Sequence, residues 1–165
     1  MKDTDIKYPE EKAQMYRLLF SQMEALLEGE KDVIANLANA SALLNEVLKD
    51  INWVGFYLMK RGELILGPFQ GKVACVHIEV GKGVCGRAVL ENEIKLVEDV
   101  HKFPGHIACD SASNSELVIP LRKNGKIVGV LDIDSPLYGR FDSTDAENLD
   151  RIAKVIEEAC DWEID

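Results

Sequence analysis

Residues 116–134 read ELVIPLRKNGKIVGVLDID, and they carry the strongest fold signal in the chain. Two runs rich in apolar and β-branched residues, 116–122 and 126–132, flank Lys123-Asn124-Gly125. An Asn-Gly pair between such runs is a strong signal for a β-hairpin, because both residues tolerate the positive φ of a tight hairpin turn. The stretch therefore predicts two adjacent antiparallel strands.

The chain before this hairpin contains further strand signals. Residues 53–59 are rich in β-branched and aromatic side chains, and Arg61-Gly62 turns them toward an apolar run at 64–66, which predicts a second hairpin. Alternation over residues 72–80 predicts another strand, and residues 94–97 predict a brief one.

Helical spacing of apolar residues appears at both ends of the chain. It predicts helices over residues 10–28 and 32–50 before a sheet region at 52–135, and a helix over 144–162 after it. Thr144 and Glu147 have the spacing of a capping box for the last helix. A short helix is expected at 84–90. Hairpins combined with flanking helices predict an α+β fold with a mainly antiparallel sheet, built as one domain over residues 1–165.

Composition narrows the class of protein. The net charge is −10, from 29 acidic and 19 basic residues, and such a surface repels nucleic acid and anionic lipid. No apolar run approaches the roughly 18–20 residues of a membrane span. The charged N-terminus does not resemble a signal peptide, so we expect a cytoplasmic protein without nucleic-acid or membrane partners.

Residues 81–86, Gly-Lys-Gly-Val-Cys-Gly, match the G-x-G-x-x-G pattern. A dinucleotide-binding interpretation requires a parallel βαβ unit, which the hairpins exclude. The glycines would either let the backbone approach closely at a helix N-terminus, where a small carboxylate can bind, or simply form a tight turn.

Three of the four cysteines, Cys75, Cys85 and Cys109, lie within 35 residues of one another, while Cys160 falls on the apolar side of the last helix. Their separations, with no C-x-x-C pair, do not suit structural zinc, so no metal site is predicted. Cys109 lies in a long polar loop at residues 100–114, where a thiol is available for chemistry. The clustering favours a redox pair in a reducing compartment, whereas Cys160 is expected in the core.

Two acidic residues share one strand face, which by default would be exposed to solvent. Asp132 and Asp134 share a strand face by the period of two, and Glu116 opens the preceding strand. If that face lines a pocket, the acids would bind an ammonium group or supply a proton; otherwise the face is exposed to solvent. Trp53 and Tyr57 are four residues apart on one predicted strand, so their rings would either form a wall of such a pocket or pack in the core.

Several segments taken together resemble the free methionine-R-sulfoxide reductases over nearly the whole chain. The segments that carry the resemblance are residues 52–57, 67–71, 83–86, 103–110 and 131–135, with Cys75 and Glu116. The resemblance implies a GAF fold with a six-stranded antiparallel sheet between helices, usually in a homodimer. It also implies reduction of the R epimer of free methionine sulfoxide, without action on the residue in proteins.

The resemblance implies a role for each site residue. Cys109 would be the nucleophile that becomes a sulfenic acid, Cys75 the main resolving cysteine and Cys85 a second participant. Thioredoxin, which receives its electrons from NADPH, would reduce the disulfide. No bound cofactor or metal is expected. The substrate-binding residues would be Trp53, Tyr57, Glu116, Asp132 and Asp134. The alternatives are a non-catalytic GAF sensor of small ligands and a thiol redox sensor.

Overall fold

The computed structural model describes residues 7–106 and 111–162. Its centre is a six-stranded sheet of order β3-β2-β1-β6-β5-β4, in which every neighbouring pair is antiparallel. The strands are β1 (Trp53–Lys60), β2 (Glu63–Gly71), β3 (His77–Glu79), β4 (Lys95–Val97), β5 (Ser115–Lys123) and β6 (Lys126–Ser135). The helices are α1 (Lys12–Leu27), α2 (Val33–Val47), α3 (Gly83–Glu91) and α4 (Ser143–Ala159), with a 3-10 helix η1 (Val100–Lys102). The predicted α+β fold with a six-stranded antiparallel sheet is confirmed.

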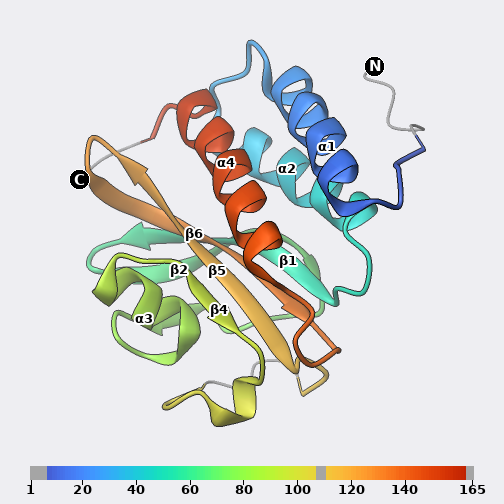
Figure 1. The fold of residues 1–165 in the computed structure, drawn as a ribbon. Helices are drawn as coiled ribbons and strands as arrows, with labels where there is room; N and C mark the ends of the chain where they lie inside the picture. The colour runs from blue at the N-terminus through green and yellow to red at the C-terminus, as the bar shows by residue number, and fades with distance from the viewer. Residues whose placement is uncertain (1–6, 107–110, 163–165) are drawn as a thin grey trace.

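The two faces of the sheet are covered differently. Helices α1, α2 and α4 pack together over one face, whereas α3 lies against the other (Figure 1). Because side chains alternate along a strand, each central strand contributes to two separate apolar clusters. The larger cluster joins the three long helices to Val54, Phe56, Ile119 and Leu131. The smaller one lies under α3 and includes Trp53, Tyr57, Val118 and Val130.

Both predicted hairpins are present. Asn124 and Gly125 connect β5 to β6 with φ values of 52° and 78°. Arg61 and Gly62 connect β1 to β2 with φ values of 51° and 81°. Positive φ at both central residues gives a turn whose twist matches that of the flanking strands, which explains why these short connections fix the antiparallel order.

The predicted strand at residues 72–80 is wrong in its first half, because only His77–Glu79 forms β3. Side chains of β1 bind two carbonyls in the preceding segment. The indole of Trp53 donates to the carbonyl of Lys72 at 3.1 Å, and the hydroxyl of Tyr57 donates to the carbonyl of Cys75 at 3.0 Å. The alternation of residues 72–76 therefore does not reflect a regular strand.

The start of α4 also differs from its prediction. Thr144 and Glu147 do not form the capping box. Instead, Asp142 accepts from the Asp145 amide at 3.0 Å, and the Asp145 carboxylate accepts from the Asp142 amide at 2.9 Å. The helix therefore begins at Ser143, one residue before the predicted start. An aspartate at N3 replaces the glutamate on which the sequence pattern was based.

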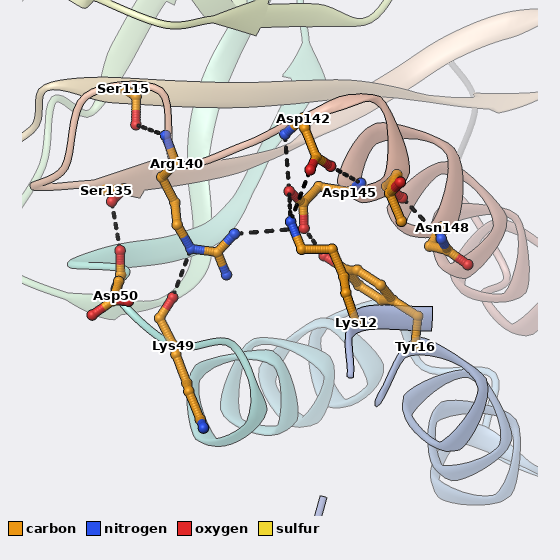
Figure 2. Close-up of polar contacts among 11 residues, drawn as sticks. Lys12, Tyr16, Lys49, Asp50, Ser115, Ser135, Arg140, Asp142, Asp145 and Asn148 are labelled. Atoms are coloured by element: carbon orange, nitrogen blue, oxygen red, sulfur yellow. Dashed lines mark hydrogen bonds and ion pairs between the residues drawn. The ribbon is translucent and has the colours of Figure 1, made fainter. Parts of the chain in front are cut away.

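The buried Asp145 carboxylate also joins α4 to α1 (Figure 2). Tyr16 donates its hydroxyl to Oδ1 at 2.6 Å, and Lys12 binds Oδ2 at 2.8 Å. Arg140 approaches Oδ1 to 3.5 Å and donates to the carbonyl of Lys49 at 2.9 Å. This network connects the two helices and the end of α2 on the sheet face opposite α3.

None of the helices in the described part of the chain combines the length and the apolar character that crossing a bilayer requires.

Candidate active site

A row of predicted site residues crosses three adjacent strands on the face covered by α3. Trp53 of β1 lies opposite Asp134 of β6, and Asp134 in turn lies opposite Glu116 of β5. Residues paired directly across an antiparallel sheet point to the same face. Asp132 and Tyr57, two and four residues along their strands, therefore share this face.

These side chains line one pocket between the sheet and α3. Six of the eight predicted site residues contribute to it: Trp53, Tyr57, Cys85, Glu116, Asp132 and Asp134. Cys75 contacts this group through its carbonyl, which accepts the Tyr57 hydroxyl. Cys109 lies outside the described residues.

One side of the pocket is aromatic. The ring of Trp53 stacks on Phe69 at a centroid distance of 5.1 Å and on Tyr57 at 5.9 Å. Trp53 and Tyr57 are both buried within the cluster under α3, so they combine core packing with a place on the pocket wall. Their polar atoms bind backbone carbonyls, which fixes both rings.

The other side carries a buried acidic cluster. Glu116 is 7% exposed and Asp132 is 5% exposed, while Asp134 is half-buried. The alternative of a solvent-exposed acidic face is therefore excluded for Glu116 and Asp132. The Cys85 thiol lies 4.0 Å from Oε2 of Glu116. Oδ1 of Asp132 is buried and has no hydrogen-bond partner among the described residues.

Burial sets the protonation of this cluster. Desolvation, reinforced by the charges of Asp132 and Asp134, raises the pKa of Glu116 well above its usual value. Burial also raises the pKa of Asp132, although hydrogen bonding with Glu116 opposes the shift. The pKa of Cys85 is raised by burial and by the nearby carboxylates. A carboxyl with a raised pKa, such as Glu116, is suited to hold a proton and to act as a general acid.

Known proteins share the fold and much of the sequence of this chain. The GAF domain family matches residues 38–161. Free methionine-R-sulfoxide reductase of Escherichia coli is 54% identical over 146 residues, which cover 88% of this chain and 88% of that protein. The chain belongs to the free methionine-R-sulfoxide reductase family. Its enzymatic character and its GAF fold follow from that membership.

Solved structures of the same family extend the similarity to three dimensions. The fRMsr of Staphylococcus aureus in complex with substrate is 58% identical and superposes with a TM-score of 0.85, over 87% of this chain and 94% of that one. The free methionine-R-sulfoxide reductase from Neisseria meningitidis, also in complex with its substrate, is 43% identical with a TM-score of 0.91. That match covers 96% of this chain and 95% of the other.

The described cysteines of this reductase family member differ in state and position. Cys75 is disulfide-bonded, whereas Cys85 and Cys160 are free thiols. Cys85 lies in the first turn of α3, beside the acids. Cys160 is buried among the long helices on the opposite face of the sheet, which confirms its prediction as a core residue.

The glycine motif of residues 81–86 brings α3 close to the sheet. A Cβ on Gly86 would lie 2.5 Å from the carbonyl oxygen of Glu79, so only glycine allows this approach. Gly83 opens α3 with a φ of 63°, and its N-cap Lys82 makes no side-chain capping bond. The segment also forms a tight turn, because the Lys82 amide donates to the carbonyl of Glu79 at 3.0 Å. Both features that the sequence left open are therefore present, and carboxylate binding stays a prediction.

Three further polar residues line the pocket and were not predicted as site residues: Lys82, His106 and Ser113. Lys82 lies within the glycine motif, which offered a signal for it. His106 belongs to the predicted functional loop, and burial lowers its pKa, so the imidazole is mainly neutral near pH 7. Ser113 accepts a hydrogen bond from Asn52 at 3.0 Å, a contact between segments 61 residues apart that no local pattern indicates.

Proposed function

We propose that this chain reduces free methionine-R-sulfoxide to methionine with electrons from thioredoxin. The observation that carries the proposal is a buried Glu116 with a raised pKa beside Asp132 and Asp134, facing an aromatic wall, in a chain 54% identical to the free methionine-R-sulfoxide reductase of Escherichia coli. Sulfoxide reduction needs a proton donor and a thiol, and a free amino acid needs partners for both of its charged ends.

Each part of the substrate has a matching group in the pocket. Asp134 and Oδ1 of Asp132, which has no hydrogen-bond partner among the described residues, accept the ammonium group. Lys82 and the N–H groups at the start of α3 bind the carboxylate, because the first turn of a helix leaves its N–H groups available. Trp53 and Tyr57 contact the S-methyl group. A peptide lacks these free charged ends, which accounts for restriction to the free amino acid.

In the chemical step, the Cys109 thiolate attacks the sulfoxide sulfur while Glu116 protonates the sulfoxide oxygen. The oxygen passes to the cysteine, which becomes a sulfenic acid, and methionine leaves. The sulfoxide sulfur gains two electrons and the cysteine sulfur loses two. Protonation by Glu116 avoids formation of an oxyanion next to Asp132 and Asp134.

Resolution of the sulfenic acid follows. The Cys75 thiol attacks the Cys109 sulfur, a disulfide forms, and the oxygen leaves as water. The disulfide-bonded state of Cys75 and the free, deeply buried state of Cys85 favour Cys75 as the resolving residue. Cys85 then acts as a second participant beside Glu116. Thioredoxin returns both cysteines to thiols.

The proposal includes a single GAF domain over residues 1–165, a homodimer, a cytoplasmic location and no bound cofactor. The dimer is tested by light scattering after size-exclusion chromatography. A monomer at micromolar concentration would contradict that part alone.

The activity is tested by methionine release from the separate R and S epimers of free methionine sulfoxide, with thioredoxin, thioredoxin reductase and NADPH. We expect turnover of the R epimer, loss of turnover in Cys109→Ser, and retention in Cys160→Ser, which removes a buried thiol on the other face of the sheet. A methionine sulfoxide residue inside a peptide should not react.

Two results would overturn the proposal. Absence of turnover with either epimer, from reduced and folded protein, would favour a ligand-binding GAF sensor. Full turnover in Cys109→Ser would exclude the assigned nucleophile. A sensor would retain ligand binding in Cys109→Ser, measurable by calorimetry, without any reaction.

A further inference from the structure

We propose that Cys85, Glu116 and Asp132 form a binding site for a thiophilic divalent cation of the Zn²⁺ and Cd²⁺ class, which blocks the substrate pocket. The cation is an inhibitor rather than a cofactor. The proposal departs from the sequence-based expectation of no metal site. Cation binding does not require the reductase activity, whereas inhibition rests on the proposed function.

The geometry of the three side chains suits a small cation. One ligand atom from each, the Cys85 sulfur and a carboxylate oxygen from Glu116 and Asp132, lie within 4.8 Å of one another, and all three residues are buried. Zinc binds sulfur at about 2.3 Å and carboxylate oxygen at about 2.0–2.2 Å, which places tetrahedral ligands about 3.5 Å apart. Shifts of roughly an ångström or less would close the site, since the Cys85 sulfur already lies 4.0 Å from a Glu116 oxygen.

A second observation points to a cationic ligand. Oδ1 of Asp132 is buried without a hydrogen-bond partner among the described residues, and Asp132 lines the pocket. A buried carboxylate oxygen without a partner is costly, so a cation at this position would stabilise it. Asp134, half-buried on the same strand face, adds negative charge nearby, while Lys82 and His106 lie on the pocket wall contributed by other segments.

The donor set determines which cation fits. Cation binding displaces the protons of the Cys85 thiol and the Glu116 carboxyl. The resulting thiolate with two carboxylates favours zinc-like and cadmium-like ions over Mg²⁺ and Ca²⁺, which prefer oxygen ligands only. Three protein ligands leave a fourth position for water, as in open zinc sites. No metal-site spacing is visible in the sequence here, because Cys85 and Glu116 are 31 residues apart and meet only through the packing of α3 on β5.

Competition with substrate follows from the overlap of the two sites. The proposed cation occupies the Asp132 oxygen that binds the substrate ammonium and the Glu116 carboxyl that donates the proton. Free methionine sulfoxide should therefore weaken cation binding. Conversely, micromolar Zn²⁺ should inhibit turnover in a manner that excess substrate relieves.

The test uses the Cys75→Ser/Cys109→Ser double variant, which retains Cys85 and Cys160 as its two thiols. Cd²⁺ is titrated and followed by ultraviolet thiolate-to-cadmium charge-transfer absorption and by calorimetry. We expect one equivalent to bind. The absorption should disappear on adding Cys85→Ser and persist on adding Cys160→Ser, the matched control at a second buried thiol. Glu116→Gln, which keeps the side-chain shape, should weaken binding at least tenfold while circular dichroism stays unchanged.

Several outcomes would overturn the proposal. They are absence of the absorption in the folded double variant, persistence of the absorption after Cys85→Ser, and its loss after Cys160→Ser. Unchanged affinity in Glu116→Gln would exclude the carboxylate ligand. Cd²⁺ binding that substrate does not weaken would refute the overlap. Because the cation is observed spectroscopically in a variant without the proposed nucleophile, failure of the reductase assay would leave this site standing.

Discussion

The hydroxyl of Tyr57 donates a hydrogen bond to the backbone carbonyl of Cys75 at 3.0 Å. The same ring stacks with Trp53 on the pocket wall. One side chain therefore connects the proposed methionine-binding surface to the segment that carries the proposed resolving cysteine. Tyr57 is buried and lies on β1 near the centre of the sheet, so it holds the Cys75 segment against a rigid support.

Tyr57→Phe should slow resolution more than methionine release. The substitution keeps the ring and removes one neutral hydrogen bond, which contributes about 0.5–1.5 kcal/mol, or about 2–10-fold in rate if it is fully expressed in the positioning of Cys75. Rapid-quench measurement of methionine release, with mass spectrometry of disulfide formation, separates the two steps. An equal fall in both rates would indicate a general disturbance of the pocket instead.

Glu116→Gln and Asp134→Asn should affect different kinetic parameters. Loss of the proton donor at Glu116 should lower kcat by about 10²–10⁴-fold with a small change in KM. Loss of one charged partner for the ammonium at Asp134 should chiefly raise KM, by about 10–100-fold from a charge-assisted hydrogen bond of about 1.5–3 kcal/mol. Steady-state kinetics of both variants on the R epimer provide the measurement. The reverse pattern would exchange the two assigned roles.

The raised pKa of Glu116 should make stability depend on pH. In the folded protein this carboxyl keeps its proton above its ordinary pKa of 4.5, at which the unfolded chain releases it. Its contribution is fully present below pH 4.5 and is lost as the pH rises toward the folded pKa. Glutamine does not titrate, so Glu116→Gln should gain stability relative to wild type as the pH rises.

Urea unfolding of wild type and Glu116→Gln, at steps from acid to neutral pH, measures this difference. The raised pKa of Asp132 contributes a slope of the same sign, and because Asp132 hydrogen-bonds to Glu116, the comparison reports the interacting pair rather than Glu116 alone. A difference between the two proteins that does not vary with pH would contradict a raised pKa at this residue.

The sequence contained enough information for the sheet and for much of the pocket. Turn chemistry at Asn124-Gly125 and Arg61-Gly62 is local, and it fixes the direction of β1, β2, β5 and β6. The period of two then places Asp132 and Asp134 on one face. The pairing of β6 with both β1 and β5 was not readable locally, and that pairing aligns Trp53, Asp134 and Glu116.

Predictions failed where a long-range contact overrides a local pattern. Residues 72–76 alternate like a strand, yet Trp53 and Tyr57 bind carbonyls of that segment from β1. Ser113 lines the pocket from a loop whose sequence has no hydrophobic periodicity, and it accepts a hydrogen bond from Asn52. The pKa of Glu116 likewise depends on burial under α3, a property of the packed protein rather than of its neighbours in sequence.

Gly55→Ala should disturb the fold and the pocket together. A Cβ at Gly55 would lie 2.3 Å from Cβ of Phe69 and 2.9 Å from the carbonyl oxygen of Pro68, so β2 would have to move. Phe69 stacks on Trp53, and its displacement would reach the aromatic wall. We expect a loss of about 1–3 kcal/mol in unfolding free energy and a raised KM. Gly67→Ala, whose Cβ would meet its nearest neighbour at 3.1 Å, should cost less.

Tyr16→Phe should lower stability without changing catalysis. The Tyr16 hydroxyl donates to the buried Asp145 carboxylate at 2.6 Å, on the sheet face opposite the pocket (Figure 2). A hydrogen bond to a charged group contributes about 1.5–3 kcal/mol, so the urea midpoint should fall clearly while kcat and KM stay at wild-type values. Tyr138→Phe is the matched control, because Tyr138 is 63% exposed and the change should stay within about 0.5 kcal/mol. A change in KM in Tyr16→Phe would mean that the helical layer communicates with the pocket through the sheet, since Tyr16 does not line the pocket.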